Sequence, residues 1–105
     1  MIVTVFRSRL RPEAEAEYMP MAERMHELAR AMPGYISHKT FVAEDGERLT
    51  LVEFESEEAQ KAWAVHPEHI EAKTLGRRRF FSEYRLQICN LVRDSADRPR
   101  RPVAG

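Results

Sequence analysis

The chain has 105 residues, of which 43% are apolar and 32% charged, and Lys plus Arg balance Asp plus Glu at 17 each. This length fits one domain with a modest core, and zero formal charge excludes a general attraction to nucleic acid or to an anionic membrane. The single cysteine, the absence of an apolar run of about 18 residues and the lack of a secretion signal predict a cytoplasmic protein with no membrane segment.

The first two predicted elements are a strand over residues 1–10 and a helix over residues 12–32. The strand sequence MIVTVFRSRL is rich in β-branched and apolar residues. Apolar residues at spacings of three and four indicate the helix, and Pro12 fits its first position. Pro20 removes a backbone donor and is expected to kink or divide this helix, which Pro33 and Gly34 then end.

Residues 35–44 and 47–55 are predicted as the two arms of a hairpin, because Gly46 in the Asp45-Gly46 pair tolerates positive φ. Ser56 is the expected cap of the next helix. Pro67 is expected to break that helix and begin a second, short one, which Gly76 should end.

The last predicted strand covers residues 80–92, and its alternation places Phe81 on the same face as Glu83. Residues 94–105 are charged, contain proline and lack apolar periodicity. We therefore expect a domain over residues 1–93 followed by a disordered tail over residues 94–105.

The order strand, helix, strand, strand, helix pair, strand predicts an α+β, ferredoxin-like βαββαβ fold. Helices would cover one face of a four-stranded antiparallel sheet. Both registers of the first, second and fourth strands carry large apolar residues, so the open face also needs a cover. A second copy of the chain is the simplest cover, which predicts a homodimer, an α+β barrel with the sheets packed face to face.

RNA-recognition domains share this element order and need exposed aromatic and basic residues on their central strands. The third strand here reads LTLVEFE over residues 49–55, which is acidic and mostly aliphatic. We expect no nucleic-acid partner.

Trp63, His66 and His69 are the first candidate site, with the histidines as catalytic residues. A neutral imidazole can accept a proton from a phenol or quinol, which leaves an electron-rich anion that reacts with oxygen, and the indole can stack on a flat substrate. In the structural alternative, Trp63 anchors its helix to the sheet, His66 caps the next helix and His69 hydrogen-bonds the backbone.

Tyr35, His38 and Phe54 form a second candidate set, on the hairpin beside the cavity expected between sheet and helices. With Trp63 they are the predicted substrate-binding residues. The alternative is that they are ordinary strand residues, with His38 partly exposed.

Three other groups of potentially reactive or ligand-binding residues have simpler structural interpretations. The pattern His66-x-x-His69 supplies two nitrogens, but a stable metal site needs a third ligand and Pro67 interrupts the helix, so we expect no metal. The basic run over residues 77–79 follows a helix end, where positive charge is favoured, and is expected to be solvated or to contact a partner subunit. Cys89 has no evident activator and is not expected to be a nucleophile.

An ordered set of short motifs resembles the antibiotic biosynthesis monooxygenase family over about residues 1–93. The family consists of small dimeric α+β-barrel proteins and includes oxygenases that act on quinols and polycyclic phenols without metal or flavin, together with haem-degrading enzymes. The resemblance implies a cofactor-independent monooxygenase that oxidises a small aromatic substrate with oxygen. The matching motifs are Pro33-Gly34-Tyr35, the Asp45-Gly46 hairpin, EFESEEA over residues 53–59, Trp63, His66-Pro67, His69 and Gly76-Arg77.

The chain departs from the characterised branches of this family at several positions. Haem-degrading members use an Asn in the first strand, a Trp and a later His. Trp63 matches, but the first strand has no Asn and the His position falls near Lys73. Anthrone oxygenases carry an Asn and a Trp where Thr50 and Phe54 stand here. A non-catalytic small-ligand-binding dimer and a haem-degrading monooxygenase are therefore the alternative functions.

Overall fold

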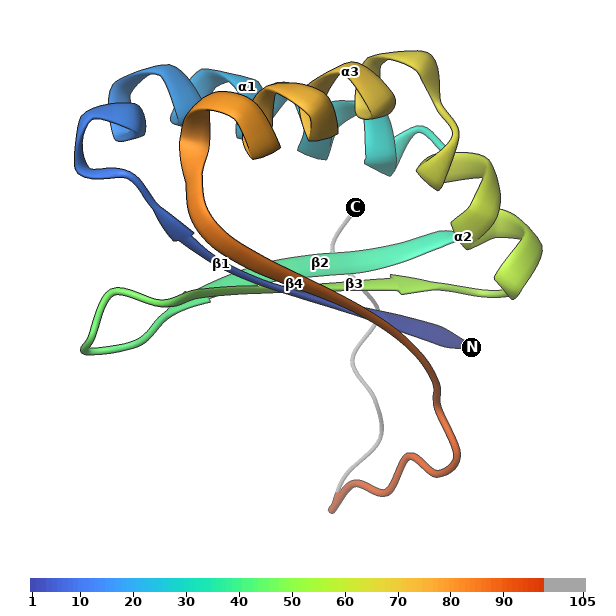
Figure 1. Ribbon diagram of the computed structural model, residues 1–105. Coiled ribbons are helices and arrows are strands. Elements are labelled where there is room, and N and C mark those ends of the chain that lie inside the picture. The colour runs from blue at the N-terminus through green and yellow to red at the C-terminus, as the bar shows by residue number, and fades with distance from the viewer. Residues whose placement is uncertain (98–105) are drawn as a thin grey trace.

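The structure, a computed structural model, describes residues 1–97 and has one layer of helices over one face of a four-stranded sheet (Figure 1). The strands follow the order β2-β3-β1-β4, and every neighbouring pair is antiparallel. This arrangement confirms the predicted ferredoxin-like fold. The elements are β1 (Ile2–Leu10), the 3₁₀ turn η1 (Pro12–Ala14), α1 (Glu15–Arg30), β2 (Tyr35–Val42), β3 (Arg48–Phe54), α2 (Glu57–Ala64), α3 (Pro67–Leu75), the π-helical turn η2 (Gly76–Phe80) and β4 (Phe81–Asn90).

Local signals placed the hairpin and the two later helices correctly. Gly46 has φ 91° in the turn between β2 and β3. The Ser56 hydroxyl accepts a hydrogen bond from the Ala59 N–H at 3.1 Å, as a helix cap does. Pro67 begins α3. Residues 91–97 form no helix or strand, and the rest of the predicted tail, residues 98–105, lies outside the described residues.

The expected division of the first helix at Pro20 is wrong, because α1 continues through this residue. Proline costs the helix one hydrogen bond, to the carbonyl of Ala16. The side of α1 that carries Pro20 is exposed, so water can solvate that carbonyl. Tyr18 and Ala29, which are buried and lie before and after Pro20 in the chain, hold the helix on the sheet. Packing of an amphipathic face outweighs the local preference.

The predicted end of the second short helix is confirmed, because α3 ends at Leu75 with Gly76 as its C-terminal cap, and from Gly76 the chain continues into the π-helical turn η2 with right-handed angles. The reason for glycine is a close approach. A Cβ at Gly76 would lie 2.5 Å from a ring carbon of Phe81, so any larger residue would displace that ring from the core.

A register shift between Arg9 and Leu10 corrects the predicted alternation of β4. Arg9 pairs with Glu83, whereas Leu10 pairs with Phe81. The shift turns Phe81 toward the helices, where its ring packs edge-on against Phe6 at 5.4 Å between centroids. Phe81 therefore belongs to the core and does not share a face with Glu83.

No helix of residues 1–97 covers the second face of the sheet (Figure 1). Cross-strand pairs place Val5 beside Leu51 and Gln87 on this face. The face is apolar over β1 and β3 but polar along β4. The prediction that β4 carries large apolar residues on both of its faces is therefore wrong. Large apolar residues of β4 face the helix side instead and stay about half exposed: Tyr84 at 48%, Leu86 at 47% and Ile88 at 51%.

We predict that Gly34→Ala lowers the free energy of unfolding by about 3 kcal/mol. Gly34 has φ 84°, which costs an alanine about 1–2 kcal/mol, and the new Cβ would lie 2.6 Å from the Ala59 Cβ on α2. Gly46→Ala is the matched control, because Gly46 has φ 91° and open space around it. Urea denaturation should show about 1 kcal/mol for the control, and equal losses would contradict the close packing.

Candidate functional site

A cavity of about 390 Å³ lies between the sheet and the helices. Its walls contain members of both core clusters, the one around Tyr18 and Phe81 and the one around Phe54 and Trp63. The cavity therefore separates two halves of the core. Its walls are mainly apolar and include these polar side chains: Thr4, Tyr18, His26, His38, Thr50, Gln60, Trp63, His69, Lys73, Arg77 and Tyr84.

His69 and Trp63 meet in the wall of this cavity. Their rings are stacked, with centroids 4.1 Å apart and planes 11° from parallel. The His69 Nδ1 lies 3.0 Å from the carbonyl oxygen of Trp63. A carbonyl only accepts hydrogen bonds, so Nδ1 carries the proton and the neutral ring keeps its lone pair on Nε2. Burial lowers the pKa of His69 from 6.5 to about 4, so the ring is neutral at neutral pH.

His66 occupies a different position from His69. It is the N-terminal cap of α3, and its Nδ1 accepts a hydrogen bond from the Glu68 N–H at 3.2 Å. His66 is not among the residues that line the cavity. Of the three residues in the first candidate set, the structure brings Trp63 and His69 together around the cavity and leaves His66 at the helix start.

The second candidate set lies at another part of the same cavity. Phe54 is 1% exposed and lines the cavity, as does His38. Tyr35 packs edge-on against Phe54 and its hydroxyl lies 2.5 Å from the His38 Nδ1. Tyr35 is outside the lining and orients His38 from behind, so His38 and Phe54 are the members that a ligand can touch.

His26 is a cavity residue that the sequence reading missed. Its ring lies 3.9 Å from that of His38, centroid to centroid. Burial, and then the neighbouring His38, lower the pKa of His26 to about 4. Burial also lowers the pKa of His38. Its helical spacing could have indicated this place. His26 is four residues from Ala22 and three from Ala29, so all three lie on the face of α1 that lines the cavity.

Two further polar wall residues, Thr4 and Lys73, were not selected from the sequence. The Thr4 hydroxyl is buried and makes no hydrogen bond with any described residue. An unpaired buried hydroxyl costs about 1–3 kcal/mol, which a polar ligand atom can recover. The Lys73 Nζ donates to the Ala64 carbonyl at 2.8 Å, and burial followed by Arg77 lowers the pKa of Lys73.

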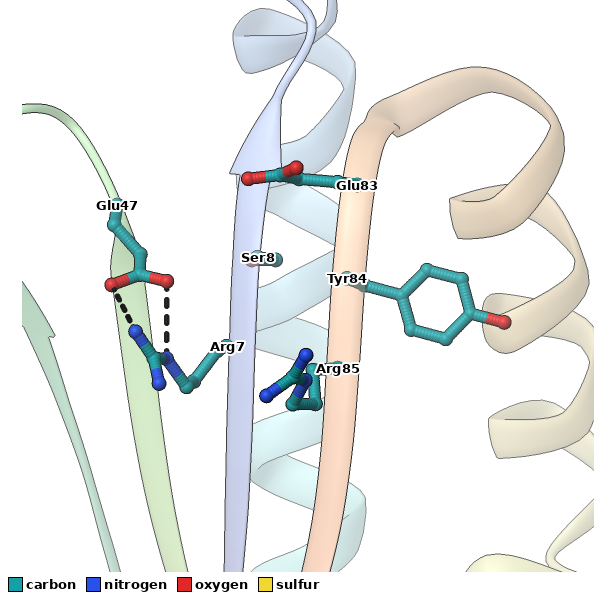
Figure 2. Close-up of a pocket in the computed structure, with 6 residues that line it drawn as sticks. All are labelled: Arg7, Ser8, Glu47, Glu83, Tyr84 and Arg85. Carbon is teal, nitrogen blue, oxygen red and sulfur yellow. Dashed lines mark hydrogen bonds and ion pairs between the residues drawn. The ribbon is translucent and has the colours of Figure 1, made fainter.

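A second hollow, of about 230 Å³, lies at β1 and β4 and has an ionic lining. Figure 2 shows the Arg7 guanidinium facing the Glu47 carboxylate, with Arg85 beside them and the Tyr84 ring pointing away. Arg7 donates two hydrogen bonds to Glu47, at 3.0 and 2.9 Å. Both carboxylates of the lining are committed to arginines, Glu47 to Arg7 and Glu83 to Arg9. The cavity between sheet and helices is therefore the candidate active site.

Within residues 1–97, no group of three or more His, Cys, Asp or Glu side chains has the arrangement of a metal site. The Nδ1 atoms of His66 and His69 lie against different backbone groups, the Glu68 N–H and the Trp63 carbonyl. No helix of this described part is long and apolar enough to cross a membrane.

Known proteins resemble this chain over most of its length. Residues 1–75 match the family model described as antibiotic biosynthesis monooxygenase. YqjZ, an uncharacterised protein of Bacillus subtilis, is 30% identical over 86 residues, which cover 82% of this chain and 75% of YqjZ. Rv0793 from Mycobacterium tuberculosis has a TM-score of 0.78 at 18% identity, covering 90% of this chain and 98% of that one. SnoaB, a cofactor-independent oxygenase from Streptomyces nogalater, has a TM-score of 0.77 at 16% identity, covering 92% and 97%.

Proposed function

The chain belongs to the antibiotic biosynthesis monooxygenase family, and on that premise we propose that it oxidises a small aromatic substrate, a quinol or polyphenol, with molecular oxygen and no cofactor. The observation that carries the proposal is the neutral His69, whose unprotonated Nε2 belongs to a cavity wall it shares with the Trp63 ring. A proton acceptor beside a stacking surface suits a flat phenol.

In this proposal His69 Nε2 accepts the hydroxyl proton of the bound phenol, which leaves an electron-rich anion. That anion reduces oxygen. For a quinol with an unsubstituted ring position, one oxygen atom replaces a ring hydrogen and the other leaves as water. The substrate loses two hydrogens to that water and gains one oxygen atom, a four-electron oxidation that reduces one O₂, so a benzenediol becomes a hydroxyquinone (C₆H₆O₂ + O₂ → C₆H₄O₃ + H₂O). Oxygen is the only oxidant that the balance requires.

The remaining wall residues bind and orient the substrate. Trp63 and Phe54 contact the ring plane and exclude water from the reacting face. The unpaired Thr4 hydroxyl donates a hydrogen bond to a substrate oxygen and thereby fixes the position of the substrate in the cavity. His38, held by Tyr35 and packed against the tilted His26 ring, provides a second neutral imidazole for the other hydroxyl group of a quinol.

The experiment that tests this function is oxygen uptake with a panel of hydroquinones in the presence of a chelator, followed by mass spectrometry after turnover in ¹⁸O₂. We expect uptake with at least one quinol and one labelled atom in each product molecule. No uptake with any phenol, together with saturable quenching of Trp63 fluorescence, would identify a non-catalytic binder. A Soret absorbance band that appears when haem is added and then changes with time would favour the haem-degrading alternative.

We also propose that the open sheet face packs against a second copy of the chain. The supporting observation is its apolar patch, made of Val3, Val5, Leu49, Leu51 and the 46% exposed Phe41, on a face that no helix covers. A self-complementary patch of this kind suits a two-fold dimer. The charged pairs around Arg7 and Arg9 lie at one end of the same strands and form its polar rim.

We predict that Leu51→Glu weakens this dimer by roughly 100-fold or more. Two-fold symmetry places the new carboxylate in the interface twice, and each unpaired buried charge costs at least about 1–3 kcal/mol. Sedimentation equilibrium measures the change. Val65→Glu is the control, because Val65 is an exposed residue between α2 and α3. A wild-type chain that is monomeric at micromolar concentration would contradict the proposal.

A further inference from the structure

We propose that Lys73 and Arg77 form a cationic subsite that binds a carboxylate group carried by the aromatic substrate. The inference rests on the proposed function of the same cavity and narrows its substrate class to aromatic acids. Placement, charge and hydrogen-bonding capacity support it independently.

The placement follows from helical spacing. His69, Lys73 and Arg77 are four residues apart, and residues at this spacing lie on one face of a helix. All three line the cavity, the first two from α3 and the third from η2. His69 and Lys73 are partly buried whereas Arg77 is exposed, so the row leads from the proposed base to the mouth. Four residues advance a helix by about 6 Å, which places Lys73 one turn from His69.

The charge of the cavity wall is one-sided. Asp and Glu equal Lys and Arg in the whole chain, yet no described residue of the cavity lining is acidic, and its Lys and Arg residues are Lys73 and Arg77. Four other arginines form ion pairs: Arg7 with Glu47, Arg9 with Asp45, Arg24 with Glu68 and Arg79 with Glu17. Neither Lys73 nor Arg77 forms an ion pair within residues 1–97, so an incoming anion meets two uncompensated cations.

Both cations retain hydrogen-bond donors for a ligand. The Lys73 ammonium uses one N–H on the Ala64 carbonyl and keeps two. The Arg77 guanidinium makes no hydrogen bond with a described side chain or carbonyl, so its planar fork is available for a bidentate carboxylate. Burial, and then the nearby charge of Arg77, lower the pKa of Lys73, and a bound anion would relieve the repulsion between the two cations.

The test compares two probes of the same shape, 2-naphthoate and its neutral amide, by isothermal titration calorimetry at pH 7. We expect the wild-type chain to bind 2-naphthoate at least about 10-fold more tightly, because hydrogen bonds between charged groups are stronger than those of the neutral amide. Equal affinities, or no binding of 2-naphthoate at millimolar concentration, would overturn the subsite. Either calorimetric result is compatible with oxygen uptake on neutral quinols. The test of the subsite and the test of the proposed function can therefore fail separately.

Variants locate the effect within the cavity. Arg77→Gln and Lys73→Gln should each weaken 2-naphthoate binding by about 10-fold and leave the amide within 2-fold. Arg78→Gln is the matched control, because it removes the same charge from the same turn at an exposed position outside the lining. An equal loss in Arg78→Gln would show a diffuse field effect and overturn the assignment. Arg77 is exposed, so its variant keeps the test valid if Lys73→Gln fails to fold.

Discussion

Replacing His69 by alanine is expected to lower the rate of quinol oxidation by about 10²–10⁴-fold, the range contributed by a general base. Its Nδ1 is committed to the Trp63 carbonyl, so Nε2 is the nitrogen that accepts the substrate proton. Oxygen-electrode kinetics measure the loss. The affinity of a non-reacting ligand, read by calorimetry, should change much less, because Trp63 and Phe54 still form the cavity wall.

Two companion variants separate this role from a structural one. His69→Gln keeps the volume and a hydrogen bond to the backbone but removes the basic nitrogen, so it should be as slow as the alanine variant. His66→Asn removes the other imidazole and keeps a side chain that caps α3, so its rate should stay within about 3-fold of wild type. A loss in His66→Asn as large as that in His69→Gln would instead identify His66 as the base.

The elements that the sequence predicted correctly are those set by local chemistry. Gly46 takes a positive φ that few residues tolerate, Ser56 satisfies the free N–H groups of α2, and Pro67 can begin a helix but not continue one. Each of these signals acts within about four residues. The resulting element order was enough to predict the sheet and its helical cover.

The predictions that failed depend on contacts across the sheet. Pro20 stays inside α1 because residues on both sides of it pack on the strands. Phe81 faces the core because β1 and β4 shift register at Arg9. A proline that packing holds inside a helix has the same local sequence as one that ends a helix, so neighbouring residues alone do not distinguish them.

The candidate site likewise contains contacts between sequence neighbours, which could be predicted, and contacts that depend on the fold, which could not. Trp63 and His69 are six residues apart, and their closeness in the chain was enough to group them in one candidate site, although the stacking of their rings was not predicted. His26 and His38 come from α1 and β2, so their contact follows only from how the helix sits on the sheet. The row of His69, Lys73 and Arg77 was visible as a four-residue spacing, but its meaning depends on the lining of the cavity.

The stability of the fold should fall by roughly 3–5 kcal/mol as the pH is lowered from about 7 to 4. The pKa values of His69 and His26 are lowered from 6.5 to about 4. Between these values the unfolded chain binds more protons than the folded one, so the free energy of unfolding decreases as pH falls. His69 contributes about 3 kcal/mol at 1.36 kcal/mol per unit of pKa, and the half-buried His26 contributes less because solvent screens it.

Urea denaturation at fixed protein concentration, in steps from pH 7 to 4.5, measures this slope where acidic groups add little. The pKa values of Asp45 and Glu47 are lowered by their bonds to Arg9 and Arg7, so these carboxylates take up protons at lower pH. His69→Gln should lose more than half of the slope, and His66→Asn should retain it. A wild-type slope near zero would mean that water reaches His69 freely. The imidazole would then titrate near 6.5, and the cavity could not hold the neutral, desolvated base on which the proposed oxidation depends.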